Sequence, residues 1–330
     1  MEKTVHYLET HSQNPYYNLA FEEYVLCHRT EGDYLLLWQN DNTIVVGHNQ
    51  NTEAEINRAF VEEHHINVVR RGTGGGAVYH DLGNLNYSFI TDVGDDGISI
   101  RRFTQPVVAA LRSLGLNAEA SGRNDILVEG RKVSGTAQRR HAGRILHHGT
   151  LLFDANPGMV AGALNVDPEK FRSKSTKSVR ARIGNIRDFL PVDMDLPAFW
   201  TYLKDALSGG GLTPDALTAD ELAAVERLKT EKYDTWAWNY GRSPKFDVTR
   251  KRYWDGGCLE ASVSIADGRI TDIRFCGDFL AVRDMDALLA ALKGTAYRPE
   301  AVRPVLEASP VAELFGAITA DEVIATLFDL

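Results

Sequence analysis

Residues 70–89 read RRGTGGGAVYHDLGNLNYSF, in which four glycines fall within five positions directly after Arg70 and Arg71. Glycine lets the backbone approach a ligand closely and expose its N–H groups, and arginine offers planar, paired donors to phosphate or carboxylate. The glycines also fit a G-x-G-x-x-A dinucleotide-binding pattern, but that fingerprint continues into a helix. Here a turn and an alternating strand pattern follow, and the chain contains no Gly-Lys pair of a P-loop. The stretch therefore favours an anion-binding loop between strands, with a plain flexible hairpin as the alternative.

Short apolar runs separated by turn residues surround this loop. Strands are predicted at 35–38 and 43–46 around the turn Asn40-Asp41-Asn42, at 66–69, 126–128, 131–134 and 149–153, with a half-buried strand at 85–89. Helices are predicted at 18–28 and 104–114, where Pro106 suits the first turn. Hairpins with interspersed helices are typical of a mostly antiparallel sheet. The predicted fold class is α+β rather than a doubly wound parallel sheet.

A domain boundary is predicted near residue 245. Before it, Thr218 and Glu221 form a capping box that opens a helix. After it come a hairpin at 259–275, with Asp267-Gly268 as the turn, and a helical tail from 285 to 330 that contains a second capping box at Thr319. We therefore divide the chain into a large domain, 1–245, and a small accessory domain, 246–330.

Composition narrows the classes of function. The 330 residues carry 36 Lys and Arg against 45 Asp and Glu, a net charge of −9 that argues against a general nucleic-acid binder. Three scattered cysteines are too few for a disulfide framework and fit a reducing compartment. The start of the chain has no apolar leader segment, and no run is long enough to span a membrane. We expect a cytoplasmic protein without nucleic-acid or membrane partners.

A second polar motif, GRNDILVEGRKVSGTAQ, covers residues 122–138. Asn124 and Asp125 open its first strand, and Asp125 could orient a ligand or hold Mg²⁺ through oxygen. Lys132 lies in the return strand beside Ser134 and Gly135. A lysine there is normally solvated, but in this setting it could hold a carboxylate and an α-phosphate together while charge develops.

Two further stretches leave alternatives open. His147 and His148 could bind zinc with His141, but adjacent residues of a strand point to opposite faces, so packing or a substrate contact is favoured. The basic run from Lys170 to Arg182 is either a solvated loop, a segment that closes over a phosphate-bearing intermediate, or a surface for an acidic partner.

Together these motifs, with HHGTLL at 147–152, SVRARIGNI at 178–186 and WNYG at 238–241, resemble lipoate–protein ligase A. The resemblance runs from about Asn14 through Pro191, and the segment from Trp254 to Leu280 resembles the accessory domain of the longer bacterial ligases. It implies a biotin/lipoate ligase-like fold with a mixed, largely antiparallel sheet, flanking helices and a small C-terminal α/β domain.

The resemblance also implies an activity. Lipoate and Mg²⁺-ATP would give lipoyl-adenylate and pyrophosphate, and the acyl group would pass to a lysine of an apo lipoyl domain of a 2-oxoacid dehydrogenase or of the glycine-cleavage H protein. A monomer is expected. The sequence leaves open whether octanoate competes with lipoate.

By this resemblance, individual residues receive roles. Arg71 and Lys132 would be catalytic and neutralise carboxylate and phosphate, and Lys132 would contact the lipoyl carbonyl. The remaining expected positions fall into three groups: Gly76, Ala77, Val78 and Tyr79 for the nucleotide; Asn124 and Asp125 near phosphate, with Asp125 on the metal; and Gly74, Gly75, His80, Ser134, Gly135 and His148 for the acyl substrate. The run from Lys170 to Arg182 would be the adenylate-binding loop, and Thr73 replaces a serine common in the family.

Four alternatives to this activity share some of these features. A thioester-forming transferase needs a thiolate near the lysine, and no cysteine lies between Cys27 and Cys258. A biotin ligase has a different glycine-arginine pattern. A transferase that accepts preformed lipoyl-adenylate, and a non-enzymatic lipoate binder, would keep a similar pocket and stay as alternatives.

Overall fold

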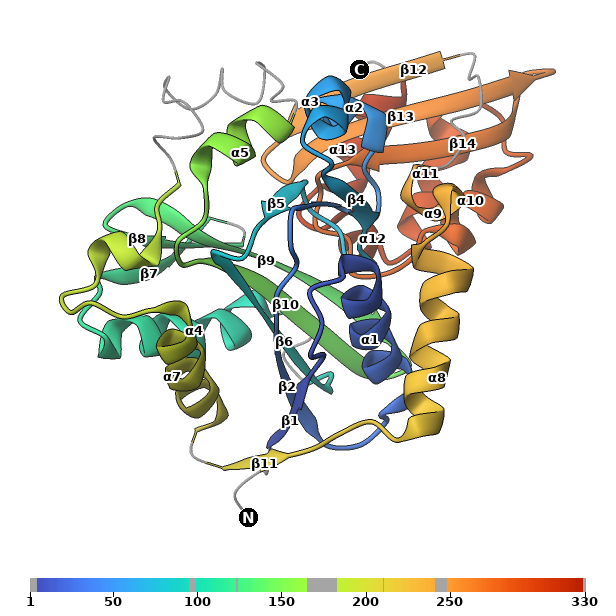
Figure 1. Cartoon of the computed structure of the whole chain (residues 1–330). Helices are drawn as coiled ribbons and strands as arrows, with labels where there is room; N and C mark the ends of the chain where they lie inside the picture. Colours follow the sequence, from blue (N-terminus) through green and yellow to red (C-terminus); the bar gives the residue numbers. More distant parts are fainter. Residues whose placement is uncertain are drawn as a thin grey trace.

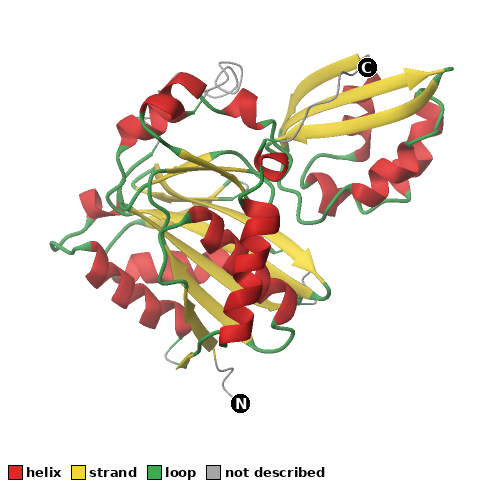
Figure 2. Ribbon diagram, turned by 45° about the vertical axis from the view of Figure 1, so that its right-hand side comes forward, coloured by secondary structure: helices red, strands yellow, loops and turns green. Residues whose placement is uncertain are grey.

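The computed structural model describes residues 5–94, 99–122, 124–164, 183–209, 211–240 and 248–328. Its larger part is built on an eight-stranded sheet with helices on both faces, and its smaller part is a three-stranded sheet backed by helices (Figure 2). No helix in these ranges is long and apolar enough to cross a membrane.

The large sheet is mixed and largely antiparallel, as predicted. Its spatial order is β11-β1-β2-β6-β10-β9-β8-β7 (Figure 1). Only β1 pairs in parallel fashion, with β2 and with β11, and the other neighbouring strands run antiparallel. The strands are β1 (Val5–Glu9), β2 (Asp33–Trp38), β6 (Asn84–Asp92), β7 (Ala118–Ser121), β8 (Asp125–Val128), β9 (Arg131–His141), β10 (Arg144–Leu152) and β11 (Leu212–Pro214).

Helices cover both faces of this sheet because alternate residues of its strands are apolar on each side. Leu35 and Leu37 of β2 pack toward α4 (Ile100–Ser113) and α7 (Leu196–Ser208). Leu36 and Trp38 pack toward α1 (Pro15–His28) and α8 (Ala219–Leu228) on the opposite side. The predicted capping box opens α8, and a single π-helical turn, η3 (Lys229–Tyr233), follows it.

A second, three-stranded sheet carries the glycine-rich loop. It is made of β4 (Asn67–Arg70), β3 (Thr43–Val46) and β5 (Val78–His80), in that order. Short helices pack around it: α2 (Thr52–Glu55), α3 (Arg58–Glu63), α5 (Pro157–Ala163) and α9 (Trp236–Asn239). The 3-10 turn η2 (Ile186–Phe189) packs instead on the core of the large sheet. Strands β2 and β3 flank the predicted turn but do not pair, because each belongs to a different sheet.

Two local predictions are wrong. Strand β6 is buried on both faces rather than half-buried, because its alternating Asn86 and Ser88 face a buried polar network instead of solvent. Helix α4 begins at Ile100, since the Ser99 hydroxyl caps it, and Pro106 therefore lies well inside the helix rather than in its first turn.

The C-terminal part has its own apolar core. Strands β12 (Val248–Trp254), β13 (Gly257–Ala266) and β14 (Arg269–Gly277) form an antiparallel sheet, and the predicted hairpin is its second half. Four helices pack on it: α10 (Asp286–Leu292), α11 (Pro299–Glu307), α12 (Val311–Phe315) and α13 (Ala320–Phe328). Thr319 and Glu322 form the second capping box. The boundary predicted near 245 falls among residues 241–247, outside the described ranges, and stays a prediction.

Candidate active site

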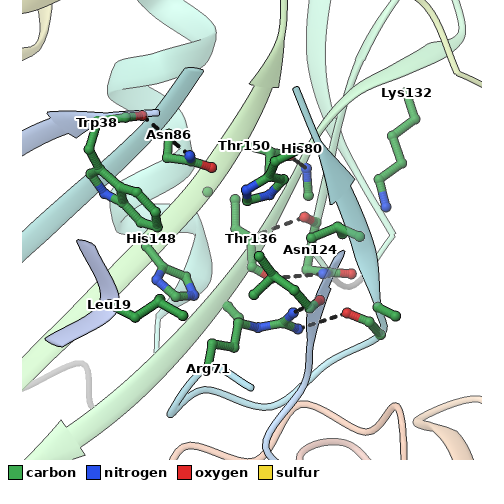
Figure 3. A pocket seen from close by; sticks show the side chains of 17 residues that line it. Leu19, Trp38, Arg71, His80, Asn86, Asn124, Lys132, Thr136, His148 and Thr150 are labelled. Atoms are coloured by element: carbon green, nitrogen blue, oxygen red, sulfur yellow. Dashed lines mark hydrogen bonds between the residues drawn. The ribbon is translucent and has the colours of Figure 1, made fainter. Parts of the chain in front are cut away.

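A pocket opens where the large sheet meets the glycine-rich loop (Figure 3). Its empty volume is about 610 Å³, part of it open to solvent. In Figure 3, Trp38, Leu19 and His148 lie at one end and Lys132 and Asn124 at the other, so the pocket has a largely apolar end and a polar, cationic end. The lining residues are Leu19, Trp38, Val45, Arg71, Gly76, Ala77, Val78, His80, Asn86, Asn124, Lys132, Gly135, Thr136, Ala137, His148, Gly149 and Thr150.

Arg71 ties the glycine-rich loop into a closed ring. Its Nη2 donates to the carbonyls of Gly74 and Gly76 at 2.6 and 2.9 Å, and its Nε donates to the Thr73 hydroxyl at 2.9 Å. Burial lowers the pKa of Arg71 to about 10, with the nearby Glu22 carboxylate opposing the shift, so the guanidinium is charged at neutral pH. The loop therefore presents a buried positive charge at the pocket wall.

Arg70, in contrast, is part of the scaffold. Its guanidinium donates to the carbonyls of residues 47, 48 and 50, to Thr52 and to the backbone of Trp238 and Asn239. These bonds fasten the loop after β3 to helix α9. The residues alone did not separate the two arginines, and the resemblance assigned the site role to Arg71, which is the arginine that lines the pocket.

Lys132 stands at the polar end of the pocket, in β9. Its Nζ is 2.8 Å from a carboxylate oxygen of Asp125, and both side chains are about one-third exposed. Asn124 keeps this hairpin in register, because its Nδ2 donates to the Thr136 carbonyl at 2.7 Å. An ion pair this exposed is exchangeable, so the ammonium can be redirected to an incoming anion.

His148 belongs to a buried polar network behind the pocket. Its Nδ1 lies 2.9 and 3.0 Å from the two carboxylate oxygens of Glu22, and its Nε2 lies 2.8 Å from the Thr73 hydroxyl. The Ser88 hydroxyl donates to Glu22 at 2.5 Å and accepts from the Trp38 indole at 2.9 Å. The network thus connects the apolar end of the pocket to the glycine-rich loop.

His80 is a neutral group facing the pocket. Burial, and after it the neighbouring guanidinium of Arg71, lowers the pKa of His80 to about 3. Its Nδ1 is 3.2 Å from the Asn40 amide, whereas its Nε2 is buried without a hydrogen-bond partner in the described structure. A ligand atom in the pocket could satisfy that nitrogen.

Buried neutral histidines should make the fold acid-sensitive. Burial also lowers the pKa of His147 to about 3 and that of His48 to about 4. Because the unfolded chain binds these protons near pH 6.5 and the folded chain does not, stability falls as pH decreases below 6.5. At pH 5 each of these histidines should lower the free energy of unfolding by about 2 kcal/mol relative to neutral pH. Urea denaturation at the two pH values measures this difference.

His147→Phe tests this expectation, since a phenyl ring can keep the stacking on Phe103 and removes one titrating group. The pH slope of the unfolding free energy should fall by about 1.2 kcal/mol per pH unit between pH 6 and 5. A variant with the wild-type slope would show that His147 titrates normally in the folded chain.

Backbone groups of the C-terminal part reach this loop directly. The N–H groups of Gly74 and Gly75 donate to the carbonyls of Ala281 and Phe279, at 3.2 and 3.0 Å. A Cβ at Gly74 would lie within 2.9 Å of three backbone atoms of this segment, so no side chain fits there. The loop is thus held from one side by Arg71 and from the other by the C-terminal part.

Charged side chains add to this contact. Arg139 of β9 pairs with Glu23 of α1 at 3.2 Å and with Asp284 at 3.4 Å, and Asp284 also lies 3.5 Å from His48. Lys232 completes the neutralisation of Glu23 at 2.7 Å. Arg139 therefore lies between the helices of the large part and the C-terminal segment.

The residues predicted for the site divide into two sets. The pocket brings together Arg71, Gly76, Ala77, Val78, His80, Asn124, Lys132, Gly135 and His148. It is not lined by Gly74, Gly75, Tyr79, Asp125 or Ser134. Of these, the two glycines contact the C-terminal part and Asp125 pairs with Lys132 at the rim. The Tyr79 hydroxyl donates to Asn42, and Ser134 is fully buried.

Sequence reasoning missed several residues of the site. Glu22, Trp38 and Asn86 carry no local motif, and only the pattern of a polar residue within an apolar run marks Glu22 and Asn86. In the described ranges no group of three or more His, Cys, Asp or Glu side chains could hold a metal ion, and His147 and His148 point to opposite faces. The run from Lys170 to Arg182 lies outside the described residues.

Two family models match this chain, one over its larger part and one over its C-terminal part. The family model of the lipoyl protein ligase A/B catalytic domain matches residues 14–208, and that of the bacterial lipoate protein ligase C-terminus matches residues 243–327. Lipoate-protein ligase LplJ of Bacillus subtilis is 42% identical over 321 residues, which cover 96% of this chain and 97% of that protein.

Two solved structures are each similar to about three quarters of this chain. Lipoate-protein ligase A bound with ATP superposes with a TM-score of 0.64 at 29% identity, covering 73% of this chain and 99% of the other. The bi-partite lipoate protein ligase of Thermoplasma acidophilum superposes with a TM-score of 0.64 at 32% identity, covering 75% of this chain and 100% of the other.

Proposed function

Because this chain belongs to the lipoate–protein ligase family, we propose that it couples lipoate to a lysine of an acceptor protein at the expense of ATP. In the first half-reaction a lipoate carboxylate oxygen attacks the α-phosphorus, the bond to the β-phosphate breaks, and pyrophosphate leaves. In the second, the lysine amine attacks the acyl carbonyl, the bond to AMP breaks, and a proton is released. The observation that carries the proposal is the pocket with an apolar end and a cationic end beside Lys132.

The apolar end suits the hydrocarbon and dithiolane portion of lipoate. Leu19, Trp38 and Val45 supply apolar surface there, and burial of such a ligand is favourable by about 25 cal/mol per Å² of apolar area. His80 offers a neutral imidazole whose Nε2 has no protein partner in the described structure. Octanoate presents a similar chain, so we expect it to compete with lipoate.

The cationic end suits the two anions that must meet. Lys132 holds an exchangeable ion pair, and its ammonium would bridge the lipoate carboxylate and the α-phosphate as negative charge shifts between them. Arg71 adds a fixed positive charge without giving up its bonds to the loop. The backbone of Gly76 to Tyr79 would hold the nucleotide, since Gly76, Ala77 and Val78 of this segment line the pocket.

Magnesium fits this site through Asp125. Mg²⁺ prefers one or two carboxylates together with substrate phosphates, and Asp125 supplies one partly exposed carboxylate at the rim of the pocket. When bound, the ion would neutralise phosphate charge. Asp125 would have to exchange Lys132 for the metal, which frees the ammonium for the reacting groups.

The residues that line the pocket also bear on the alternative activities. None of the three cysteines lines the pocket, and burial raises the pKa of the Cys27 thiol, so a thioester route has no support. A transferase that only accepts lipoyl-adenylate would need the same acyl end. We propose lipoyl domains and the glycine-cleavage H protein as acceptors, and a cytoplasmic monomer as the working form.

Pyrophosphate release tests the proposal directly. With ATP, Mg²⁺ and lipoate but no acceptor, we expect lipoate-dependent pyrophosphate release, and removal of Mg²⁺ by EDTA should stop it. A parallel reaction without lipoate measures the pyrophosphate that comes from contaminating ATP hydrolysis. No release, combined with transfer from synthetic lipoyl-adenylate to a lipoyl domain, would instead establish the transferase that depends on another enzyme.

A further inference from the structure

A buried carboxylate lies behind the pocket with an unusual set of partners. Glu22 of α1 is 3% exposed, yet the nitrogen nearest its carboxylate in the described structure belongs to the imidazole of His148 rather than to an arginine or lysine. Its remaining hydrogen bond comes from the Ser88 hydroxyl. Burying a carboxylate is costly unless hydrogen bonds compensate for the lost water, so both donors are needed to keep it there.

Glu22 connects to the reacting end of the pocket through two residues. His148 Nδ1 lies 2.9 Å from Glu22 Oε1, and His148 Nε2 lies 2.8 Å from the Thr73 hydroxyl. That hydroxyl accepts from Arg71 Nε, and Arg71 holds the loop carbonyls of Gly74 and Gly76. Four side chains from three separate parts of the sequence thus form one continuous chain of hydrogen bonds.

The chemistry of these groups sets the direction of every bond. An ionised carboxylate can only accept, so Nδ1 of His148 must carry a proton. Arg71 can only donate, so the Thr73 oxygen accepts from it and keeps its own proton free to donate. In the neutral imidazole the Thr73 proton therefore goes to His148 Nε2. If the imidazole proton moved to Nε2, the Thr73 oxygen would face two donors, Nε2–H of His148 and Nε–H of Arg71. The hydroxyl proton of Thr73 would then lose Nε2 of His148 as its acceptor.

We infer that Glu22 is a positioning residue: its carboxylate keeps the proton of His148 on Nδ1, and through His148 and Thr73 it holds Arg71 and the glycine-rich loop in the geometry required for adenylate formation. The inference rests on the proposed function for its effect on rate, but the position of the proton is independent of activity. A carboxylate–histidine pair commonly fixes the tautomer of the ring in this way.

Glu22→Gln is the central test. The amide is a weaker acceptor than a carboxylate and can also donate to Nδ1, so the proton of His148 should shift toward Nε2. Long-range ¹⁵N–¹H spectra of the ring nitrogens in the full-length protein report the tautomer. We expect this shift together with an about 10-fold lower rate of lipoate-dependent pyrophosphate release, a size typical of lost outer-shell partners.

Matched variants separate positioning from packing. Glu22→Asp keeps a carboxylate and should restore the Nδ1 tautomer and most of the rate. Glu22→Leu removes every acceptor and should shift the tautomer further, with an about 100-fold loss of rate. Ser88→Ala removes the other hydrogen bond to Glu22 and should leave the His148 proton on Nδ1. Thermal unfolding identifies any variant that does not fold.

The outcomes are distinct. The inference would be overturned if Glu22→Gln left the His148 tautomer unchanged, or if it shifted the tautomer but kept the wild-type rate. Equal losses of pyrophosphate-release rate in Glu22→Asp and Glu22→Gln would also overturn it. If the wild-type protein releases no pyrophosphate, the proposed function fails, while the spectra still decide whether Glu22 fixes the proton of His148.

Discussion

Replacing Lys132 by alanine is expected to lower the rate of lipoate-dependent pyrophosphate release by about 100- to 1000-fold, the effect of removing one preorganised charge from a reacting centre. The structure supports this size of effect because Lys132 is the cation at the polar end of the pocket whose partner can be exchanged. Arg71 cannot substitute for it, since its donors already hold the glycine-rich loop.

The fold should tolerate the Lys132 change, because the side chain is 37% exposed and its ion pair with Asp125 is at the rim. Arg131→Ala is the matched control, since Arg131 is an exposed neighbour in β9 that does not line the pocket. We expect it to release pyrophosphate at the wild-type rate. Near wild-type release by Lys132→Ala, with an unchanged unfolding temperature, would remove Lys132 from the reaction.

A chain that ends near residue 245 is expected to lose most of its adenylate formation and to keep acyl transfer from supplied lipoyl-adenylate. Among the described residues, all those that line the pocket precede residue 151, so this binding surface for the adenylate should survive the truncation. The glycine-rich loop does not survive unchanged, because Gly74 and Gly75 lose their acceptors and Arg139 loses Asp284. The two half-reactions, measured separately, decide the outcome.

The truncated chain provides its own control, since intact transfer shows that the large part is folded. Each part of the chain has its own apolar core, so the large part is expected to fold without residues 246–330. Adding residues 246–330 as a separate polypeptide should restore adenylate formation. Full-rate activation by the truncated chain alone would show that the C-terminal part has no role in it.

The sequence predicted those parts of the site whose residues lie close together in the chain. The hairpin that holds Asn124, Asp125 and Lys132 is closed by a tight turn, so its residues are neighbours in the structure as in the sequence. Both capping boxes form as predicted for the same reason. The α+β class followed from hairpins, and the antiparallel pairs confirm it.

What the sequence did not reveal depends on long-range pairing. Strands β2 and β3 are adjacent in the chain, yet they belong to different sheets because each finds a better partner far away, β6 and β4 respectively. Glu22 meets His148 across 126 residues, and no local pattern announces that contact. Arg70 and Arg71 are equivalent in the sequence, and only the surrounding carbonyls make one scaffold and the other site.

Main-chain atoms make part of the contact between the two parts of the chain, beside the charged side-chain pairs. Besides the bonds to Gly74 and Gly75, Arg140 N–H donates to the carbonyl of Val282 at 2.7 Å, and Gly277 N–H donates to that of Asn49 at 2.9 Å. Main-chain bonds do not depend on which side chains flank them, so the two parts can accumulate substitutions independently and still recognise each other. The exception is Gly74, where any side chain would collide with its partner.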